Sequence, residues 1–161
     1  MDGYSLDELD YKILQLIAND ARISFLEVAR ICNVSGAAVH QRVQKMITHE
    51  IIAGSEFLLN MQKIGYKVCA YLTLYFPDTE NVEDIAEKLK KIPEVVECHI
   101  IAGVTDLFVK VYARDNEHLL SIIQQRLKPL GVVKVDSMTS FRESFHRQVS
   151  FFQDLDGADA G

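Results

Sequence analysis

Three common signs of a protein's class are missing from this 161-residue sequence: paired cysteines, a long hydrophobic run and an excess of positive charge. The three cysteines, Cys32, Cys69 and Cys98, are odd in number and widely spaced, and none forms a CxxC pair. This spacing argues against a disulfide framework or a zinc site and favours small buried side chains in a reducing cytoplasm. No window approaches the run of about 18 uncharged apolar residues that a transmembrane helix needs.

The N-terminus and the composition exclude further classes. The first residues, MDGYSLDELDYK, lack the basic and hydrophobic regions of a secretory signal, so we expect a cytoplasmic protein without membrane contact. Apolar residues make up 48% and charged residues 25% of the chain, which is ordinary for a globular protein that buries a core. The length fits one medium domain or two small ones.

The charge is unevenly distributed along the chain. The net charge is −6, and residues 1–55 carry five Lys and Arg against seven Asp and Glu. The basic surface that is usual for nucleic-acid-binding proteins is therefore absent from the chain as a whole. Between Ser35 and His49, however, the sequence has Arg42 and Lys45 but no acid. One face can meet phosphates there, although a single copy would bind them weakly.

Residues 24–46 are typical of two short helices joined by a tight turn. Ser24 followed by Glu27 predicts a capping box at the first of them, and Asn33 stands where the turn needs a positive φ. Ser35 caps the second helix. This order is what a helix-turn-helix needs, although an ordinary helical hairpin has similar local features. The apolar positions expected to face the core are Leu9, Ile13, Leu16 and Ile17 in a preceding helix at about 7–19, then Val28 and Ile31, then Val39, Val43, Met46 and Ile47.

The helix that follows Ser35 carries the candidate DNA-binding residues, because the N-terminal part of a recognition helix reaches base edges. Ala37 and Ala38 are small enough for the helix to lie deep in a groove and touch a thymine methyl group, and Gln41 can pair bidentately with adenine. The other candidates contact bases or phosphates: Ser35, His40, Arg42 and Lys45.

Two of these residues also have purely structural interpretations. Ser35 can serve as a helix cap alone. Arg42 can form an ion pair with an acid of the preceding helix, such as Asp10, in place of a phosphate contact.

The second half of the chain has strand and helix patterns in the order β-α-β-β-α-β. The strands are expected at 67–76, 94–103, 106–114 and 132–141, and the helices at 80–91 and 117–130. Pro93 and Gly131 mark the helix exits. This order is the ferredoxin-like split βαβ arrangement, which places both helices on one face of a four-stranded sheet.

That arrangement leaves the other face of the sheet bare, and its residues are aromatic and apolar. The first strand places Tyr71 and Tyr75 there. The third strand adds one of two sets, either Phe108 and Tyr112 or Leu107, Val109 and Val111. A second copy of the sheet is the simplest cover for such a face, which predicts a homodimer.

These patterns divide the chain into four expected segments. A helix-turn-helix domain occupies 1–50, and the β-prone IIAGSEFLLN begins a wing and linker at 51–65. The ferredoxin-like domain occupies 66–147. The extension at 148–161 ends in small and acidic residues that are typical of disorder. The expected fold class is therefore α+β.

The chain resembles the Lrp/AsnC (feast/famine) family of transcription regulators in both halves. LDELDYKIL, ARIS and VSGAAVHQRVQKM are similar to the family's opening helix, its lead into the helix-turn-helix and its recognition helix. PEVVECHIIAGVTDLFVKVYARD is similar to its effector-binding module, where a Gly-x-x-Asp turn joins the middle strands. The resemblance covers roughly residues 5–147. It departs at the wing, where Glu50 and Ser55 replace the usual Gly and aromatic residue, and in the turn, where Val104–Thr105 lacks the aromatic residue often found there.

The resemblance implies a winged helix-turn-helix tethered to a sensor module, in proteins that form dimers, often octameric rings, and bind amino acids between dimers. In the turn, Gly103 can offer backbone N–H groups to a carboxylate and Asp106 can receive an ammonium group, although both can also serve the turn alone. The full set of candidate effector-binding residues is Gly103, Val104, Thr105, Asp106, Ser137 and Thr139.

We therefore expect a DNA-binding regulator of amino-acid or nitrogen metabolism that acts as an oligomer and responds to a small amino acid. No cofactor, metal site or catalytic set is expected. Two alternatives remain open. One is a ligand-binding oligomeric module without strong DNA binding. The other is an enzyme on the same fold, which would need an Arg-rich phosphate loop or a nucleophile with a base.

Overall fold

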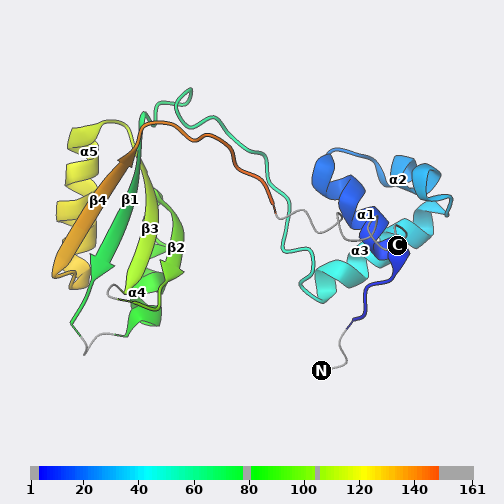
Figure 1. Cartoon of the computed structure of the whole chain (residues 1–161), viewed down its shortest axis with the longest axis horizontal. Helices are drawn as coiled ribbons and strands as arrows, with labels where there is room; N and C mark the ends of the chain where they lie inside the picture. The colour runs from blue at the N-terminus through cyan, green and yellow to red at the C-terminus, as the bar shows by residue number, and fades with distance from the viewer. Residues whose placement is uncertain (1–3, 78–80, 104–105, 149–161) are drawn as a thin grey trace, which may run out of the picture. The chain divides into compact units, whose positions relative to one another are not determined.

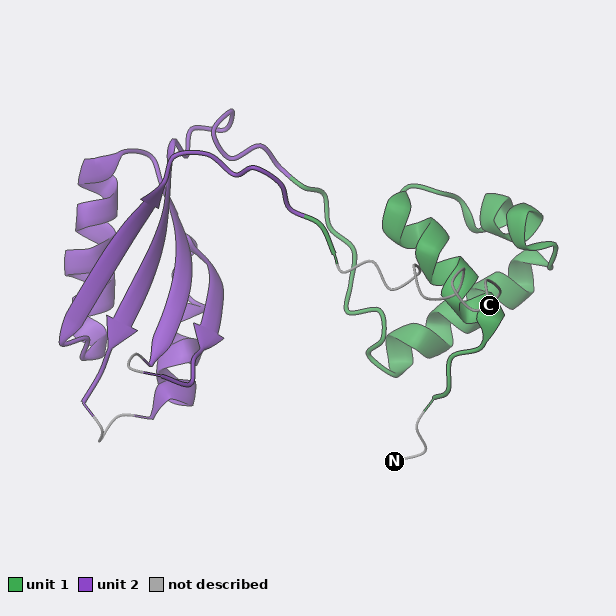
Figure 2. Cartoon of the chain, in the orientation of Figure 1, with its two compact units in different colours: residues 1–58, 147–161 green, residues 59–146 purple. Residues whose placement is uncertain are grey.

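The computed structural model describes residues 4–77, 81–103 and 106–148 and divides the chain into two compact units. Figure 1 shows a helical first unit and a second unit in which a sheet packs with its helices. The units, residues 1–58 with 147–161 and residues 59–146, are coloured separately in Figure 2. The division after Leu58 falls inside the segment predicted to be wing and linker.

The first unit is the predicted three-helix arrangement. Its helices are α1 (Glu8–Asn19), α2 (Phe25–Cys32) and α3 (Gly36–Thr48). Asp7 begins α1 through a reciprocal capping box with Asp10, because each side chain accepts a hydrogen bond from the other residue's backbone N–H. The side chains buried between the three helices are Ile13, Leu14, Val28, Ala29, Val39, Val43 and Met46.

Two details predicted for this unit are wrong. Ile31 and Ile47 are 41% and 45% exposed, because each short helix buries only a narrow stripe against the other two. Ser24 caps α2 as predicted, accepting a hydrogen bond from the N–H of Glu27 at 3.1 Å. The reciprocal half of that capping box is absent, since the Glu27 carboxylate instead pairs with Arg30 one turn later.

The wing is also not formed as predicted. Residues 51–60 contain no strand, and Phe57 and Leu58 are 72% and 79% exposed. An extended segment gains stability from a neighbouring strand, and no strand of this chain pairs with it among the described residues. The guanidinium of Arg22 lies 5.1 Å from the centre of the Phe57 ring.

The second unit is the predicted ferredoxin-like fold. Its antiparallel sheet has the strand order β2-β3-β1-β4, built from β1 (Val68–Tyr75), β2 (Val95–Ile100), β3 (Leu107–Ala113) and β4 (Lys134–Ser140). The helices α4 (Val82–Leu89) and α5 (Asn116–Ser121) lie on one face of this sheet in Figure 1. Strand alternation buries one face under the helices and leaves the other uncovered within the unit.

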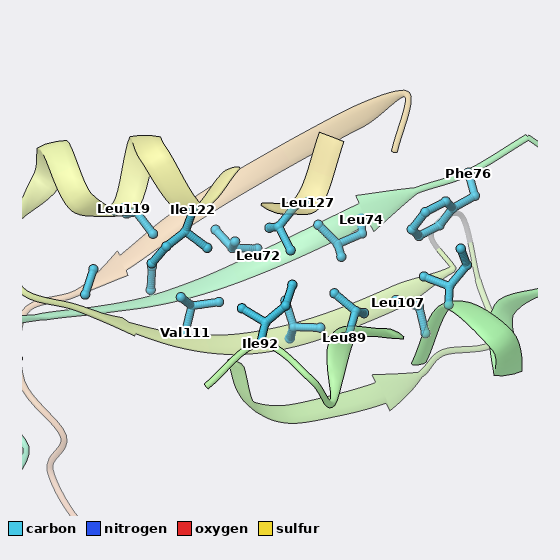
Figure 3. Packing of buried hydrophobic residues seen from close by; sticks show 14 residues of the cluster. Leu72, Leu74, Phe76, Leu89, Ile92, Leu107, Val111, Leu119, Ile122 and Leu127 are labelled. Atoms are coloured by element: carbon cyan, nitrogen blue, oxygen red, sulfur yellow. The ribbon is translucent and has the colours of Figure 1, made fainter. Parts of the chain in front are cut away.

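The core of this unit lies between the sheet and its helices (Figure 3). Alternate residues of β3 are buried there, which settles its register: Leu107, Val109 and Val111 face the helices. Fully buried partners come from β1, α4 and the segment after α5, and they include Leu72, Leu74, Ile85, Leu89 and Leu127.

The helix predicted at 117–130 is regular only in its first part. After α5 the chain continues as a π-helix, Ile122–Leu127, and a 3-10 turn, Lys128–Leu130. The N–H of Lys128 bonds to the carbonyl of Ile123, five residues back. Pro129 has no N–H and its ring would clash with the carbonyl four residues earlier, so a regular α-helix cannot continue through it. Gly131, with φ of 92°, ends the segment as predicted.

Candidate nucleic-acid interface and sensor surface

The turn between α2 and α3 has the geometry predicted from its sequence. Asn33 adopts φ 55° and ψ 45°, in the left-handed region that Asn tolerates. The N–H of Val34 then bonds to the carbonyl of Ala29 at 3.0 Å and closes the turn. Ser35 accepts a hydrogen bond from the N–H of Ala38 at 3.2 Å and begins α3. The turn therefore fixes the angle at which α3 leaves α2.

Helix α3 has one buried face and one exposed face. Val39, Val43 and Met46 are buried against α1 and α2, as predicted. Every exposed or half-buried side chain on the rest of α3 is uncharged or basic. The predicted DNA-binding residues on this exposed part are Ser35 at its start, then Ala37, Ala38, His40, Gln41, Arg42 and Lys45.

The Arg42 guanidinium is held by two carboxylates of the α1 start. Its Nη1 donates to Oδ2 of Asp7 at 2.6 Å and to Oδ1 of Asp10 at 2.8 Å. The structure thus contains the ion pair that was the alternative interpretation of Arg42. The hydrogen bond from Arg42, with that from the Asp10 N–H, holds the pKa of Asp7 below its usual range.

Asp10 is the anchor of this cluster. Its side chain is only 2% exposed, and its Oδ2 accepts hydrogen bonds from the Tyr4 hydroxyl at 2.9 Å and from the Asp7 N–H at 3.2 Å. Burial and the hydrogen bond to Asp10 raise the pKa of the Tyr4 hydroxyl. A buried carboxylate is tolerated here because it accepts several hydrogen bonds and lies beside a cation.

A hollow of about 390 Å³ lies between this N-terminal segment and α3. It brings together four of the predicted residues, Ala38, Gln41, Arg42 and Lys45, and adds Tyr4, Ser5, Asp7 and Asp10. His40 lies elsewhere on the helix, with its ring 6.0 Å from the ring of Phe25. The candidate interface therefore has an aromatic side at His40 and a polar hollow at Gln41 and Lys45.

The uncovered face of the sheet carries the predicted aromatic residues. Tyr71 of β1 stacks on Phe108 of β3, with ring centres 5.6 Å apart. Tyr75 and Tyr112 lie on the same face by strand alternation and register. Of the two sets considered for β3, the structure places Phe108 and Tyr112 here.

Lys110 lies among these aromatic rings. Its Nζ is 5.9 Å from the centre of the Tyr71 ring and 5.7 Å from that of Tyr112, and it pairs with Glu97 at 3.0 Å and Glu143 at 3.6 Å. Partial burial lowers the pKa of Lys110, but the hydrogen bond to Glu97 and the electrostatic effects of Glu97, Tyr112 and Tyr71 together outweigh it, and the pKa rises. The side chain is 12% exposed and charged.

A second ion pair lies at the β1–β4 side of the same face. Asp136 accepts hydrogen bonds from the Tyr75 hydroxyl at 2.9 Å and from Lys134 Nζ at 2.7 Å. Lys134, with Tyr75, lowers the pKa of Asp136, and the bond to Asp136 raises the pKa of Tyr75. The sheet face thus has an aromatic centre with paired charges on both sides.

The Gly-x-x-Asp turn is partly described. Val104 and Thr105 lie outside the described residues. Asp106 accepts a hydrogen bond through Oδ2 from the N–H of Phe76 at 2.7 Å, so its carboxylate caps the end of β1. Gly103 is exposed, with no atom near the position that a Cβ would take.

The structure does not bring the described members of the two groups of predicted effector residues together within one chain. Ser137 and Thr139 on β4 pair with Leu72 and Ala70, so they lie on the side of the sheet that the helices cover. Asp106 lies on the opposite side of β1 from β4, beside the C-terminal end of β1, where its N–H bonds to the carbonyl of Leu74. The register of the strands separates the two groups, which the order of residues along the chain does not reveal.

Within the described ranges no group of His, Cys, Asp and Glu side chains is suited to hold a metal ion, and no helix is long and apolar enough to cross a membrane. All three cysteines are free. Cys98 is exposed, contrary to the expectation of burial, because β2 is an edge strand with one open side. Partial burial raises the pKa of the Cys69 thiol.

Sequence reasoning missed several residues of these sites. Asp7 was missed, although it stands three residues before Asp10 with the spacing of a capping box. Lys110 lies two positions from both Phe108 and Tyr112 in the same strand, so strand periodicity places it on the bare face with them. Nothing in the sequence singles out Glu143, whose contact with Lys110 depends on the path of the chain after β4.

Two family models and several relatives match this chain. An AsnC-type helix-turn-helix domain matches residues 6–47, and an Lrp/AsnC ligand binding domain matches residues 69–149. The regulatory protein AsnC of Haemophilus influenzae is 28% identical over 91% of this chain and 98% of its own length. The transcriptional regulator LrpA of Pyrococcus abyssi is 35% identical over 81% of this chain and 92% of its own length.

Solved structures share the fold. Escherichia coli AsnC matches with a TM-score of 0.82 at 24% identity, covering 91% of this chain and 99% of that one. A transcriptional regulator of Neisseria meningitidis in complex with L-Met matches with a TM-score of 0.83 at 22% identity, covering 94% and 99%.

Proposed function

The chain belongs to the Lrp/AsnC family of transcription regulators, and from that premise we propose that it binds promoter DNA as an oligomer whose occupancy a small amino acid adjusts. It is a helix-turn-helix regulator with a ligand-binding domain and not an enzyme. The proposal extends this to a cytoplasmic protein that acts on genes of amino-acid or nitrogen metabolism, as a homodimer that assembles further to an octamer.

The observation that carries DNA binding is the exposed face of α3. Ser35 and Asn33 fix its direction, and its outward side chains contain no acid. Ala37 and Ala38 are small enough for the helix to enter the major groove, while Gln41 can pair with a base and Lys45 with a phosphate. His40 adds a ring that can approach a base or the backbone.

The small number of cations makes association of several copies part of the proposal. Lys45 is the cation of α3 for which the described residues offer no ion pair, since Arg42 is held by Asp7 and Asp10. One head would therefore bind weakly, and a second head on the same oligomer would raise the effective concentration.

The sheet supports the choice of a second copy as the partner. Tyr71 stacked on Phe108 offers an aromatic surface, Lys110 lies among its rings, and the ion pair at Asp136 adds polar groups at the β4 side. Sedimentation of wild type and of Tyr71→Ser with Phe108→Ser tests this. The double variant should dissociate, whereas Leu120→Ser on α5, 54% exposed, should not. Equal masses for all three proteins would contradict dimerisation through this face.

DNA binding is tested by fluorescence anisotropy on a labelled promoter fragment at low salt. Gln41→Ala combined with Lys45→Ala should weaken binding about 10- to 100-fold, since a bidentate base contact contributes about 1–3 kcal/mol. Gln62→Ala with Lys63→Ala removes the same residue types outside α3 and should bind as wild type. If the wild-type oligomer binds no DNA at low salt, the chain is a ligand-binding module and the regulator proposal fails.

Effector binding is tested by calorimetry with the twenty amino acids, read together with the oligomer mass. Asp106→Asn separates the two roles of this residue, because an Asn oxygen can still cap the Phe76 N–H while the charge for an ammonium group is lost. The variant should keep the fold and lose most of the affinity. If no amino acid binds wild type or changes its mass, the sensing proposal fails.

A further inference from the structure

We propose that the hollow beside α3 is a phosphate site, in which a phosphodiester group of the DNA backbone displaces the Asp7 carboxylate from Arg42. This proposal rests on the proposed DNA binding, to which it adds a phosphate site and a role for Asp7. Asp7 then acts as an internal competitor of phosphate.

The two carboxylates that hold Arg42 differ in how firmly they are fixed. The Asp10 side chain is 2% exposed and is also bonded to Tyr4 and to the Asp7 backbone, so it stays in place. The Asp7 side chain is 54% exposed. Its Oδ2 contacts Arg42, while its Oδ1 accepts from the Asp10 N–H at 2.8 Å. Asp7 can therefore release Arg42 and still cap α1.

The chemistry of the hollow suits a phosphate group. A guanidinium that binds a carboxylate through its N–H groups binds phosphate oxygens in the same way. Lys45 and Gln41 line the hollow from α3, and Ser5 lines it from the N-terminal segment. A phosphate that replaces Asp7 would meet these donors together with Arg42.

The position of the hollow also suits the DNA backbone. Gln41 and Lys45 belong both to its lining and to the exposed face of α3 that is proposed to enter the groove. In helix-turn-helix proteins the helix before the recognition helix crosses the backbone, and here the segment before α1 borders the hollow. A phosphate beside the groove thus lies within reach of Arg42 while α3 contacts the bases.

The exchange has a measurable electrostatic consequence. In the wild type, Arg42 gives up one anion as it takes another, so this contact adds little to the number of counterions released. In Asp7→Asn, the Asn side chain still caps α1, and Arg42 keeps only the Asp10 carboxylate, so it meets phosphate with one anion fewer beside it. For each copy that contacts DNA, the slope of log affinity against log salt should become steeper by about 0.9, which is about an eightfold gain at 0.1 M salt.

The experiment measures the affinity of the full chain for a promoter duplex and for a scrambled duplex of equal length, from 0.05 to 0.5 M salt. Asp7→Asn should gain affinity equally on both duplexes, because phosphate contacts carry no sequence information. Glu8→Gln removes one charge from the neighbouring residue, which has no partner among the described residues, and should gain less than about threefold with an unchanged slope.

Equal slopes for wild type and Asp7→Asn, or an equal gain from Glu8→Gln, overturn the proposed site. In that case DNA binding by the wild type still stands. If the wild type binds neither duplex at low salt, the proposed function itself fails and the phosphate site fails with it.

Discussion

Replacing Arg42 with Met is expected to destabilise the three-helix unit although Arg42 is not a core residue. Met has a similar length and keeps the apolar part of the side chain. What it removes is the guanidinium that ties α3 to the start of α1 through Asp7 and Asp10. The change therefore isolates the ion pairs from the packing.

The magnitude follows from the burial of the two carboxylates. Asp10 is nearly inaccessible, and losing a hydrogen bond to such a charged group costs about 1.5–3 kcal/mol. The Asp7 side chain is 54% exposed, so its pair with Arg42 contributes only about 0.2–1 kcal/mol. The Tyr4 hydroxyl and the Asp7 N–H still bond to Asp10. We expect a total loss of about 2–4 kcal/mol.

Hydrogen exchange read by mass spectrometry measures this loss in the full chain, because peptides of α1 and α3 report on this unit alone. About 2–4 kcal/mol corresponds to exchange about 30- to 1,000-fold faster. Peptides of β1 and β3 should keep their protection. Lys45→Met is the control, since it removes an exposed cation of the same helix without an ion pair among the described residues and should change exchange less than threefold.

A double-mutant cycle tests the cause. Asp10→Asn keeps an oxygen that accepts from Tyr4, but its neutral side chain needs no cation beside it. Adding Asp10→Asn to Arg42→Met should therefore recover part of the lost stability, with a coupling energy between the two substitutions of about 1.5–3 kcal/mol. The reasoning is refuted if Arg42→Met and Lys45→Met exchange alike, or if the two losses at Asp10 and Arg42 simply add.

Three further predictions concern other elements. Glu50→Gly should stabilise the first unit by about 1 kcal/mol in thermal unfolding, because Glu50 has φ 58°, while Glu50→Ala should not. Leu72→Ala should cost about 2–5 kcal/mol in urea unfolding because Leu72 is fully buried, against less than about 0.5 kcal/mol for the exposed Leu120→Ala. Arg42 lowers the pKa of Asp7 below its ordinary value of 3.8, so the Asp7 contribution to stability is present above pH 3.8 and is lost as the pH falls through the lower folded value. Asp7→Asn should remove this part of the acid transition, and an unchanged transition measured by circular dichroism would contradict it.

Local signals in the sequence predicted helix ends and turns well where these depend on contacts between neighbouring residues. The caps at Ser24 and Ser35 and the left-handed Asn33 depend on contacts within a few residues, and each was confirmed. The regular helix predicted after Glu117 was wrong because Pro129 acts on the preceding turn, an effect that apolar periodicity does not carry.

Contacts between segments that are distant in the sequence were harder to predict. Arg42 and Asp10 are 32 positions apart in the sequence, so the residue pattern left both an ion pair and a phosphate contact open for Arg42. The packing of α1 against α3 shows the ion pair. The wing was predicted from β-prone residues, yet the extended segment finds no partner strand in this chain. Glu143 approaches Lys110 only because β4 returns the chain beside β1.

Residue patterns were enough to predict the two-part organisation, the helix-turn-helix, the βαββαβ order and the family, because periodicity, caps and turn residues act locally and their order is read along the chain. The packed fold was needed to show which charges of the interface are compensated, which β3 residues join Tyr71 on the bare sheet face, and that Ser137 and Thr139 lie apart from Asp106 within one chain. These depend on helix packing and strand register, where a small displacement changes which side chains meet.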